Sequence, residues 1–160
     1  MKKLLAIVIS MAMIVAMIPV GVFADTTENC TEENCSHQAA IGTTHYDTLQ
    51  EAVNAGGTVK LLKNVSNGYV DSDDQEFAGS PVTVNERKTV NLDLNGYTVT
   101  SYNCTSIINN GNLTIIDSSE SKNGKVISMG SKASVAVSVG NNSKTIIDAG
   151  SFIGVEGAVI

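Results

Sequence analysis

The sequence has no tryptophan, two prolines, two histidines and three cysteines, and it is poor in basic residues. Its 10 Lys and Arg residues stand against 16 Asp and Glu residues, which gives a formal net charge of −6. An acidic chain repels phosphate backbones, so we expect no nucleic-acid partner and no basic face for anionic lipid. Leu, Ala, Glu and Lys are too sparse at helical spacing for a helical bundle.

The first 24 residues have the layout of a secretory signal peptide. Lys2 and Lys3 precede an uncharged apolar run, which Pro19 and Gly21 interrupt before Val22-Phe23-Ala24. A basic start, an apolar run and small residues at the cleavage site predict removal after residue 24. The run is also long enough to span a bilayer, so an uncleaved anchor is the alternative. We expect a secreted or cell-surface protein that contacts the membrane only during export.

Three cysteines remain after the predicted cleavage. Cys30 and Cys35 lie close enough in sequence to form a local disulfide in an exported protein, and Cys104 is expected to be a buried strand residue. Cys30, Cys35 and His37 together are one ligand short of a closed zinc site, and their spacing matches no standard zinc pattern. We therefore predict a disulfide or free thiols, with no metal and no cofactor. His45 has no nucleophile near it in sequence, so no catalytic role is predicted for it.

Residues 25–38 are polar and aperiodic, which predicts a flexible lead-in. One helix is predicted over residues 47–55, with Asp47 as its cap, Gln50 completing a capping box and Gly56-Gly57 as its stop. Tyr46 is expected to pack against this helix. The apolar stripe of the helix consists of Leu49, Ala52 and Val53.

A strand is predicted over residues 58–65, followed by a turn at Asn67-Gly68. The next segment is acidic, and we interpret it as a solvated surface loop. Its carboxylates are also the only calcium candidates, although the ligand order of an EF-hand is missing. These candidates are Asp71, Asp73, Asp74 and Glu76.

From residue 82 onward, short alternating segments recur between Asn- and Gly-rich corners. Ser106–Asp117 aligns with Val137–Asp148, and both read as strand, polar corner, strand and Asp. One such unit cannot bury its apolar side, whereas stacked units bury a continuous core. We predict an all-β solenoid of parallel strands over residues 39–160, with the 47–55 helix capping its first turn. The apolar ending Gly157-Ala158-Val159-Ile160 leads us to expect a fragment of a longer protein.

Two stretches resemble a known group of domains. Ala40–Val53 followed by Gly57–Val65 is similar to the entry segment of pectate-lyase-like right-handed parallel β-helix domains in large surface proteins of Gram-positive bacteria, and Thr89–Val99 and Gly111–Asp117 resemble their turns. The resemblance implies a right-handed parallel β-helix. It also implies a surface or adhesin-like module, with polysaccharide lyases and hydrolases among the wider relatives.

Asp93, Asp117 and Asp148 recur at strand ends, and Arg87 is the only arginine. Enzymes of this fold need a Lys or Arg base, or paired carboxylates. Asp also ends strands and starts turns, and this explains the recurrence without chemistry. We therefore predict no catalytic residues and a non-catalytic stalk or adhesin that binds polysaccharides or host glycoproteins. The alternative is a polysaccharide lyase or glycoside hydrolase with its active site on later turns.

Overall fold

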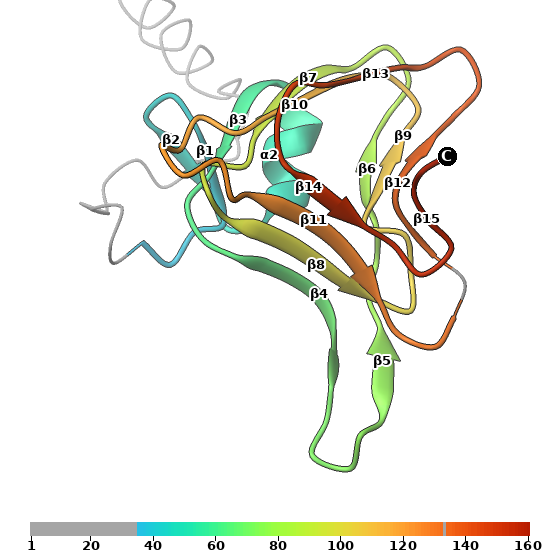
Figure 1. Ribbon diagram of the computed structural model, residues 1–160. Helices are drawn as coiled ribbons and strands as arrows, with labels where there is room; N and C mark the ends of the chain where they lie inside the picture. Colours follow the sequence, from blue (N-terminus) through green and yellow to red (C-terminus); the bar gives the residue numbers. More distant parts are fainter. Residues whose placement is uncertain (1–34, 133) are drawn as a thin grey trace, which may run out of the picture.

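The computed structural model describes residues 35–132 and 134–160, and these residues are mostly β-strand with one short helix, as the sequence predicts. Three sheets enclose a common apolar core (Figure 1). Within the described part of the chain, no helix has the length and apolar character needed to cross a membrane. The predicted signal peptide and most of the predicted lead-in lie outside the described residues.

The first sheet has six strands. In spatial order they are β13 (Lys144–Ile147), β10 (Asn112–Ile116), β7 (Thr89–Asp93), β3 (Gly57–Leu61), β1 (Ala39–Ile41) and β2 (Thr44–Tyr46). From β3 to β13 the neighbours run parallel, whereas β1 is antiparallel to both β2 and β3. The β1–β2 hairpin therefore covers the edge that β3 would otherwise expose.

The other two sheets repeat the parallel arrangement. The second contains β14 (Ser151–Ile153), β11 (Lys125–Met129), β8 (Thr98–Tyr102), β4 (Val65–Val70) and β5 (Glu76–Ala78). The third contains β15 (Gly157–Val159), β12 (Val135–Val139), β9 (Ile107–Asn109) and β6 (Val82–Val84). The chain visits the three sheets in rotation, and only β5 pairs antiparallel in these two sheets.

Buried columns of aliphatic side chains line the inside of the sheets. In the first sheet Val59, Leu92 and Ile115 are neighbours in register, and each is at most 1% exposed. Equivalent columns in the other sheets are Val65, Val99 and Val126, and Val82, Ile107 and Val137. Alternate residues of a strand face one side of its sheet, so each five-residue strand supplies two or three side chains to this core.

The register of the repeats differs from the sequence alignment by one residue in the first sheet and in the third sheet. The aligned repeats place Thr114 beside Thr145, but the structure pairs Thr114 with Ile146. In the third sheet Ile107 pairs with Val137, whereas the alignment places Ser106 there. A shift of one residue turns a side chain to the opposite face, and the corners absorb the shift in opposite directions in the two sheets.

The helix α2 (Leu49–Ala55) is confirmed, but its predicted cap is one residue too early. Thr48 is the N-cap: its hydroxyl accepts the Glu51 amide at 3.2 Å, and the Glu51 carboxylate accepts the Thr48 amide at 3.1 Å. Gly56, with φ at 83°, ends the helix as predicted. Leu49, Ala52 and Val53 face the core, and Tyr46 lies half-buried in β2 against that core.

α2 also protects the edge of the third sheet. It contacts β6, whose outer edge has no strand partner among the described residues. The Gln50 side chain takes the place of a strand there: its oxygen accepts the Thr83 amide at 2.7 Å, and its nitrogen donates to the Thr83 carbonyl at 3.0 Å. Such pairing blocks edge-to-edge association.

The segment between residues 62 and 80 departs from the sequence prediction. The predicted strand 58–65 breaks after Leu61, and Val65 begins β4. Asn67-Gly68 lies inside β4 and is not a turn. The predicted loop is partly strand: β4 and β5 form an antiparallel hairpin that projects from the body (Figure 1). At Gly68 an added Cβ would lie 2.4 Å from the Phe77 carbonyl oxygen, so the hairpin requires glycine there.

We expect Gln50→Glu to lower the free energy of unfolding by about 1–2 kcal/mol, because a carboxylate oxygen replaces the amide that donates to the Thr83 carbonyl. Urea unfolding followed by circular dichroism measures this loss. The matched control is Gln75→Glu at the exposed hairpin tip, where we expect a change within about 0.5 kcal/mol. Equal losses in the two variants would contradict the edge-pairing role of Gln50.

Candidate functional site

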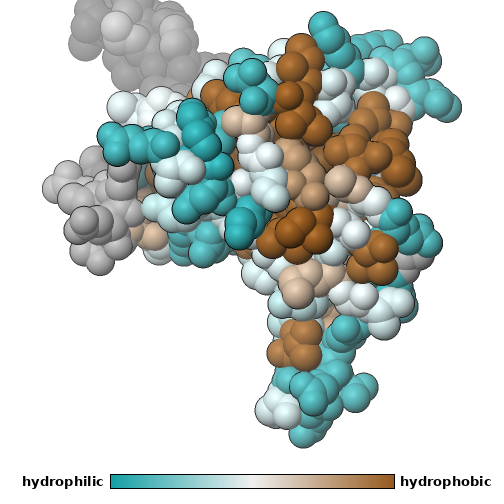
Figure 2. Space-filling view, in the orientation of Figure 1, coloured by the Kyte–Doolittle hydropathy of each residue, from teal (hydrophilic) through white to brown (hydrophobic). Residues whose placement is uncertain are grey.

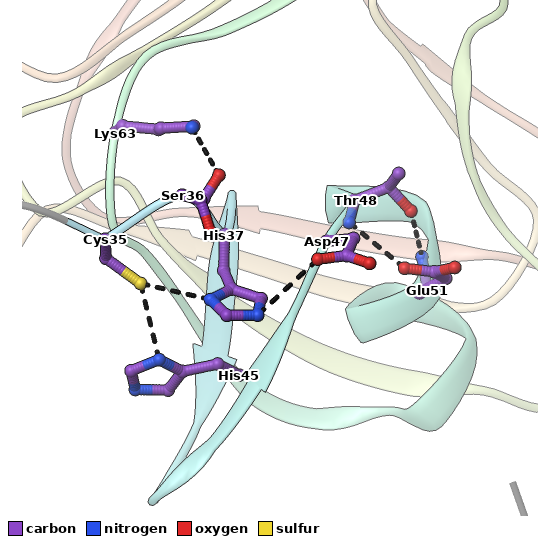
Figure 3. A network of polar contacts seen from close by, with 8 residues as sticks. All are labelled: Cys35, Ser36, His37, His45, Asp47, Thr48, Glu51 and Lys63. Atoms are coloured by element: carbon purple, nitrogen blue, oxygen red, sulfur yellow. Dashed lines mark hydrogen bonds and ion pairs between the residues drawn. The ribbon is translucent and has the colours of Figure 1, made fainter. Parts of the chain in front are cut away.

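A sulfur atom and two imidazoles meet beside the β1–β2 hairpin (Figure 3). Cys35 Sγ lies 3.3 Å from Nδ1 of His37 and 3.4 Å from Nδ1 of His45. The two rings meet edge to face, with centroids 5.4 Å apart. Among the described residues this is the only group of three or more Cys, His, Asp or Glu whose ligand atoms lie close enough to share a metal ion, all within 4.8 Å.

The hairpin register explains how residues ten positions apart come together. Ala40 pairs with His45, and Gly42 allows the tight turn between the strands because its φ is 59°. The Gln38 amide donates to the Tyr46 carbonyl at 3.0 Å, and this bond extends the ladder toward Cys35. The lead-in therefore runs beside β2, which brings Cys35 and His37 to His45.

Asp47 orients one of the imidazoles. Its Oδ1 lies 3.5 Å from Nε2 of His37, on the ring edge opposite the sulfur (Figure 3). The His37 side chain is only 14% exposed, whereas Asp47 is 81% exposed. Asp47, predicted as the helix cap, is thus a partner of His37 instead. The series Cys35, His37, Asp47 has the order of a nucleophile, a base and an orienting carboxylate.

A cavity of about 480 Å³ opens next to this cluster. Its walls include Cys35 and His45 of the cluster, and Lys60 and Asp93, which pair on the neighbouring strands β3 and β7. Its remaining walls are Ala40, Gly42, Thr58 and Leu62. The cluster therefore has access to a partly enclosed space that can admit a small molecule.

The predicted thiol pairing stays a prediction, because Cys30 lies outside the described residues. Cys35 and Cys104 have free thiols in the structure. Cys104 is half-buried in the connection between β8 and β9, so its predicted placement inside a strand is wrong. Sequence reasoning grouped Cys35 with His37 but missed His45, and only the hairpin register could have revealed it.

The four acidic calcium candidates lie on the β4–β5 hairpin, and the structure does not gather three of them into one ligand cluster. Asp71 folds the tip: its Oδ1 accepts the amides of Asp73 and Gln75 at 2.9 and 2.8 Å. Asp74 is at the tip with φ at 57°. Calcium binding at this hairpin stays the untested alternative to the predicted solvated loop.

Glu76 anchors the hairpin to the body. Its Oε2 accepts hydrogen bonds from the Ser131 amide, the Ser131 hydroxyl and the Asn103 side chain, each at 2.9 Å. The backbone amide of Ser131 is the main cause that lowers the pKa of Glu76 below its ordinary value, and the two side-chain donors add to it. The start of β5, next to the hairpin tip, is thus held against the body by a charged acceptor.

The carboxylates of Asp93 and Asp117 accept hydrogen bonds from backbone amides in the corners that follow their strands. This agrees with the prediction that these aspartates are turn residues. Asp93 Oδ1 accepts the Asn95 amide of its own corner at 3.0 Å and the Ser118 amide of the next at 2.9 Å. Asp117 Oδ1 accepts the amides of Gly96 and Ser119 at 2.8 and 3.1 Å. Asp148 is exposed, so the three do not form an equivalent ladder.

Asp117 is the most heavily bonded carboxylate of the described residues. Its Oδ1 also accepts the Ser119 hydroxyl at 2.7 Å, and its Oδ2 accepts the Gly124 amide at 2.6 Å. Burial raises the pKa of Asp117, but the hydrogen bonds from Ser119, Gly124 and Gly96 outweigh burial and hold the pKa below its ordinary value. A side chain at Gly124 would meet this carboxylate at 2.7 Å.

Comparison of the chain with protein-family models, curated proteins and solved structures finds no match. Its chemistry is therefore inferred from the geometry described above.

We expect Asp117→Asn to lower the free energy of unfolding by about 2 kcal/mol, because the amide NH2 must face a backbone N–H on one side and leave it unpaired. Chemical denaturation measures the loss. Asp148→Asn is the matched control, since it makes the same change at an exposed position, with an expected effect within about 0.5 kcal/mol.

The stability of the protein should fall as the pH is lowered from about 5 toward 2. A carboxyl group whose folded-state pKa is lowered stabilises the fold above its unfolded pKa, and this contribution is lost as the pH falls through the folded pKa. Asp117 has a lowered pKa, so the decline should be shallower in Asp117→Asn than in the unmodified chain. Identical slopes in the two proteins, from urea unfolding at each pH, would contradict this role.

Proposed function

We propose that residues 39–160 form the first turns of a right-handed parallel β-helix in an exported protein. The support is the rotation of the chain through three parallel sheets, with aliphatic columns in register inside them. The edge-covering β1–β2 hairpin and α2 lie where a first turn needs protection. The proposed class is a non-catalytic cell-surface module that binds extended glycans.

The observation that carries this function is an exposed aromatic pair on the projecting hairpin. Tyr69 and Phe77 are cross-strand neighbours whose rings stack with centroids 4.6 Å apart. They are 56% and 44% exposed, and Val70 beside them is 41% exposed. Figure 2 shows hydrophobic residues on this arm between the body and its hydrophilic tip. Exposed apolar groups gathered on a projecting element favour a binding role.

Aromatic faces suit the C–H faces of sugar rings, because the ring quadrupole places negative charge over the face. The nearby polar groups of Asp73 and Gln75 can bond sugar hydroxyl groups. The same tip also holds Asp71 and Asp74, and the whole chain is acidic, with a net charge of −6. A uronate polymer would be repelled by this charge, so the proposed ligand is a neutral glycan.

The carboxylates of the described residues favour binding over catalysis. Asp93 and Asp117 are 7% and 1% exposed, and both accept backbone amides. Neither is free to serve in an acid and base pair that faces a sugar. Arg87, the only arginine, is exposed at the corner before β7. The support for a stalk or adhesin is therefore stronger than that for a hydrolase.

We expect the mature chain to bind neutral polysaccharides in affinity electrophoresis, and Tyr69→Ala with Phe77→Ala to weaken binding about tenfold, since an aromatic contact contributes roughly 1–1.5 kcal/mol. Ile153→Ala is the control, because Ile153 is 50% exposed but lies on β14, away from the arm. Unchanged binding in the double variant would reject the aromatic site. Release of reducing ends from the bound polymer would instead identify a glycoside hydrolase.

A further inference from the structure

We propose that Cys35, His37 and His45 bind one divalent transition-metal ion, with Zn²⁺ as the best match. One thiolate sulfur and two imidazole nitrogens are soft and borderline ligands, which prefer such ions to Ca²⁺ or Mg²⁺. Three donors converge here from two segments of chain, and all three residues are partly buried. This site is independent of the proposed glycan-binding arm.

The two sulfur–nitrogen distances match tetrahedral coordination. Zn–S bonds of about 2.3 Å and Zn–N bonds of about 2.0–2.1 Å at a tetrahedral angle place sulfur and nitrogen about 3.5 Å apart. The two Sγ–Nδ1 distances are 3.3 and 3.4 Å. Without a metal the thiol can donate to one imidazole and accept an N–H from the other, so the two contacts alone do not distinguish a hydrogen-bonded trio from a metal site. A metal ion satisfies all three atoms at once, and binding it releases the thiol proton of Cys35.

Asp47 supplies the outer contact that histidine ligands of metals require. A ligand histidine donates its second ring N–H to a carboxylate or carbonyl, which orients the ring and raises its basicity. Asp47 Oδ1 lies 3.5 Å from Nε2 of His37, and this leaves Nδ1 to face the sulfur. Asp47 is therefore a positioning residue and not a ligand.

The cavity beside the cluster provides the fourth coordination position. Three protein ligands with an open position are typical of zinc sites that hold a water molecule or an exogenous ligand. Cys35 and His45 form part of the cavity wall, together with one basic residue, Lys60, and one acidic residue, Asp93. The fourth ligand is therefore a water molecule or a small molecule that enters the cavity.

The same Cys35, His37 and Asp47 series resembles a cysteine nucleophile with its base. The second imidazole favours the metal, since a nucleophile needs one base whereas His45 also approaches the sulfur at 3.4 Å. The reactivity of Cys35 with an alkylating reagent separates the two roles.

The test uses the mature chain that cleavage after residue 24 leaves, reduced and stripped of metal by a chelator. Zn²⁺ is titrated against a chromophoric chelator, and Co²⁺ is added to report geometry. We expect one ion per chain, with intense tetrahedral Co²⁺ bands and a thiolate-to-metal charge-transfer band. Zn²⁺ should also protect Cys35 from iodoacetamide and raise the Tm, because it binds only the folded arrangement.

The variants are matched by chemistry. Cys35→Ser should abolish the charge-transfer band, and His45→Gln should weaken Zn²⁺ affinity by more than about tenfold, whereas Asp47→Asn should weaken it by about tenfold. Cys104→Ser removes the other described thiol and should leave affinity unchanged. Circular dichroism without metal checks that each variant folds.

Any of the following results would overturn the proposal. The first is Zn²⁺ affinity that is equal in the parent chain and in Cys35→Ser. The second is a loss in Cys30→Ser as large as that in Cys35→Ser, which would contradict the open fourth position. The third is rapid alkylation of Cys35 that Zn²⁺ does not slow, or a Cys30–Cys35 disulfide in the secreted protein, found by peptide mass spectrometry.

Discussion

Parallel backbone hydrogen bonding between strands of successive passes is the constraint on which the rest of the structure depends. Once β7, β10 and β13 pair in register, Leu92, Ile115 and their neighbours must point inward together. The corners must then be short, and their amides must find acceptors away from water. Asp93 and Asp117 meet that demand, because each carboxylate bonds amides of two successive corners.

The sequence was sufficient to predict most of the strands from residue 82 onward, the helix and the corner role of Asp93 and Asp117, because alternation and turn chemistry are local signals. It could not predict the register. Thr114 and Thr145 begin identical tetrapeptides, yet Thr114 pairs with Ile146 because the corner lengths set the alignment of backbone amides. The predicted helix cap was one residue too early. Asp47 and Thr48 are both good N-cap residues, but the side chain of Asp47 contacts His37, and Thr48 caps the helix.

The β4–β5 arm and the metal-ligand cluster were missed because each depends on an antiparallel pairing that local sequence does not specify. Asn67-Gly68 has the composition of a turn, but Gly68 lies within a strand. Glycine is needed there because the backbone of Phe77 in the facing strand leaves no room for a side chain. His45 had no partner nearby in sequence, and Ala40 had to pair with it before Cys35 could reach it. Spacing rules for zinc sites rely on closely spaced ligand pairs such as C-x2-C, whereas here Cys35 and His37 lie before β1 and His45 lies in β2.

Both candidate binding features therefore lie where the parallel pairing is interrupted. Within the regular sheets the backbone polar groups form hydrogen bonds in the strand ladders and the corners. The inward side chains pack in the apolar core. The β1–β2 hairpin and the β4–β5 arm depart from that pattern, so their outward side chains are not needed to hold the sheets together. A change at Tyr69 or His45 can alter binding at little cost to core burial, whereas a change at Asp117 cannot. The candidate binding residues therefore lie on elements that depart from the repeat, whereas the repeat itself holds the scaffold together.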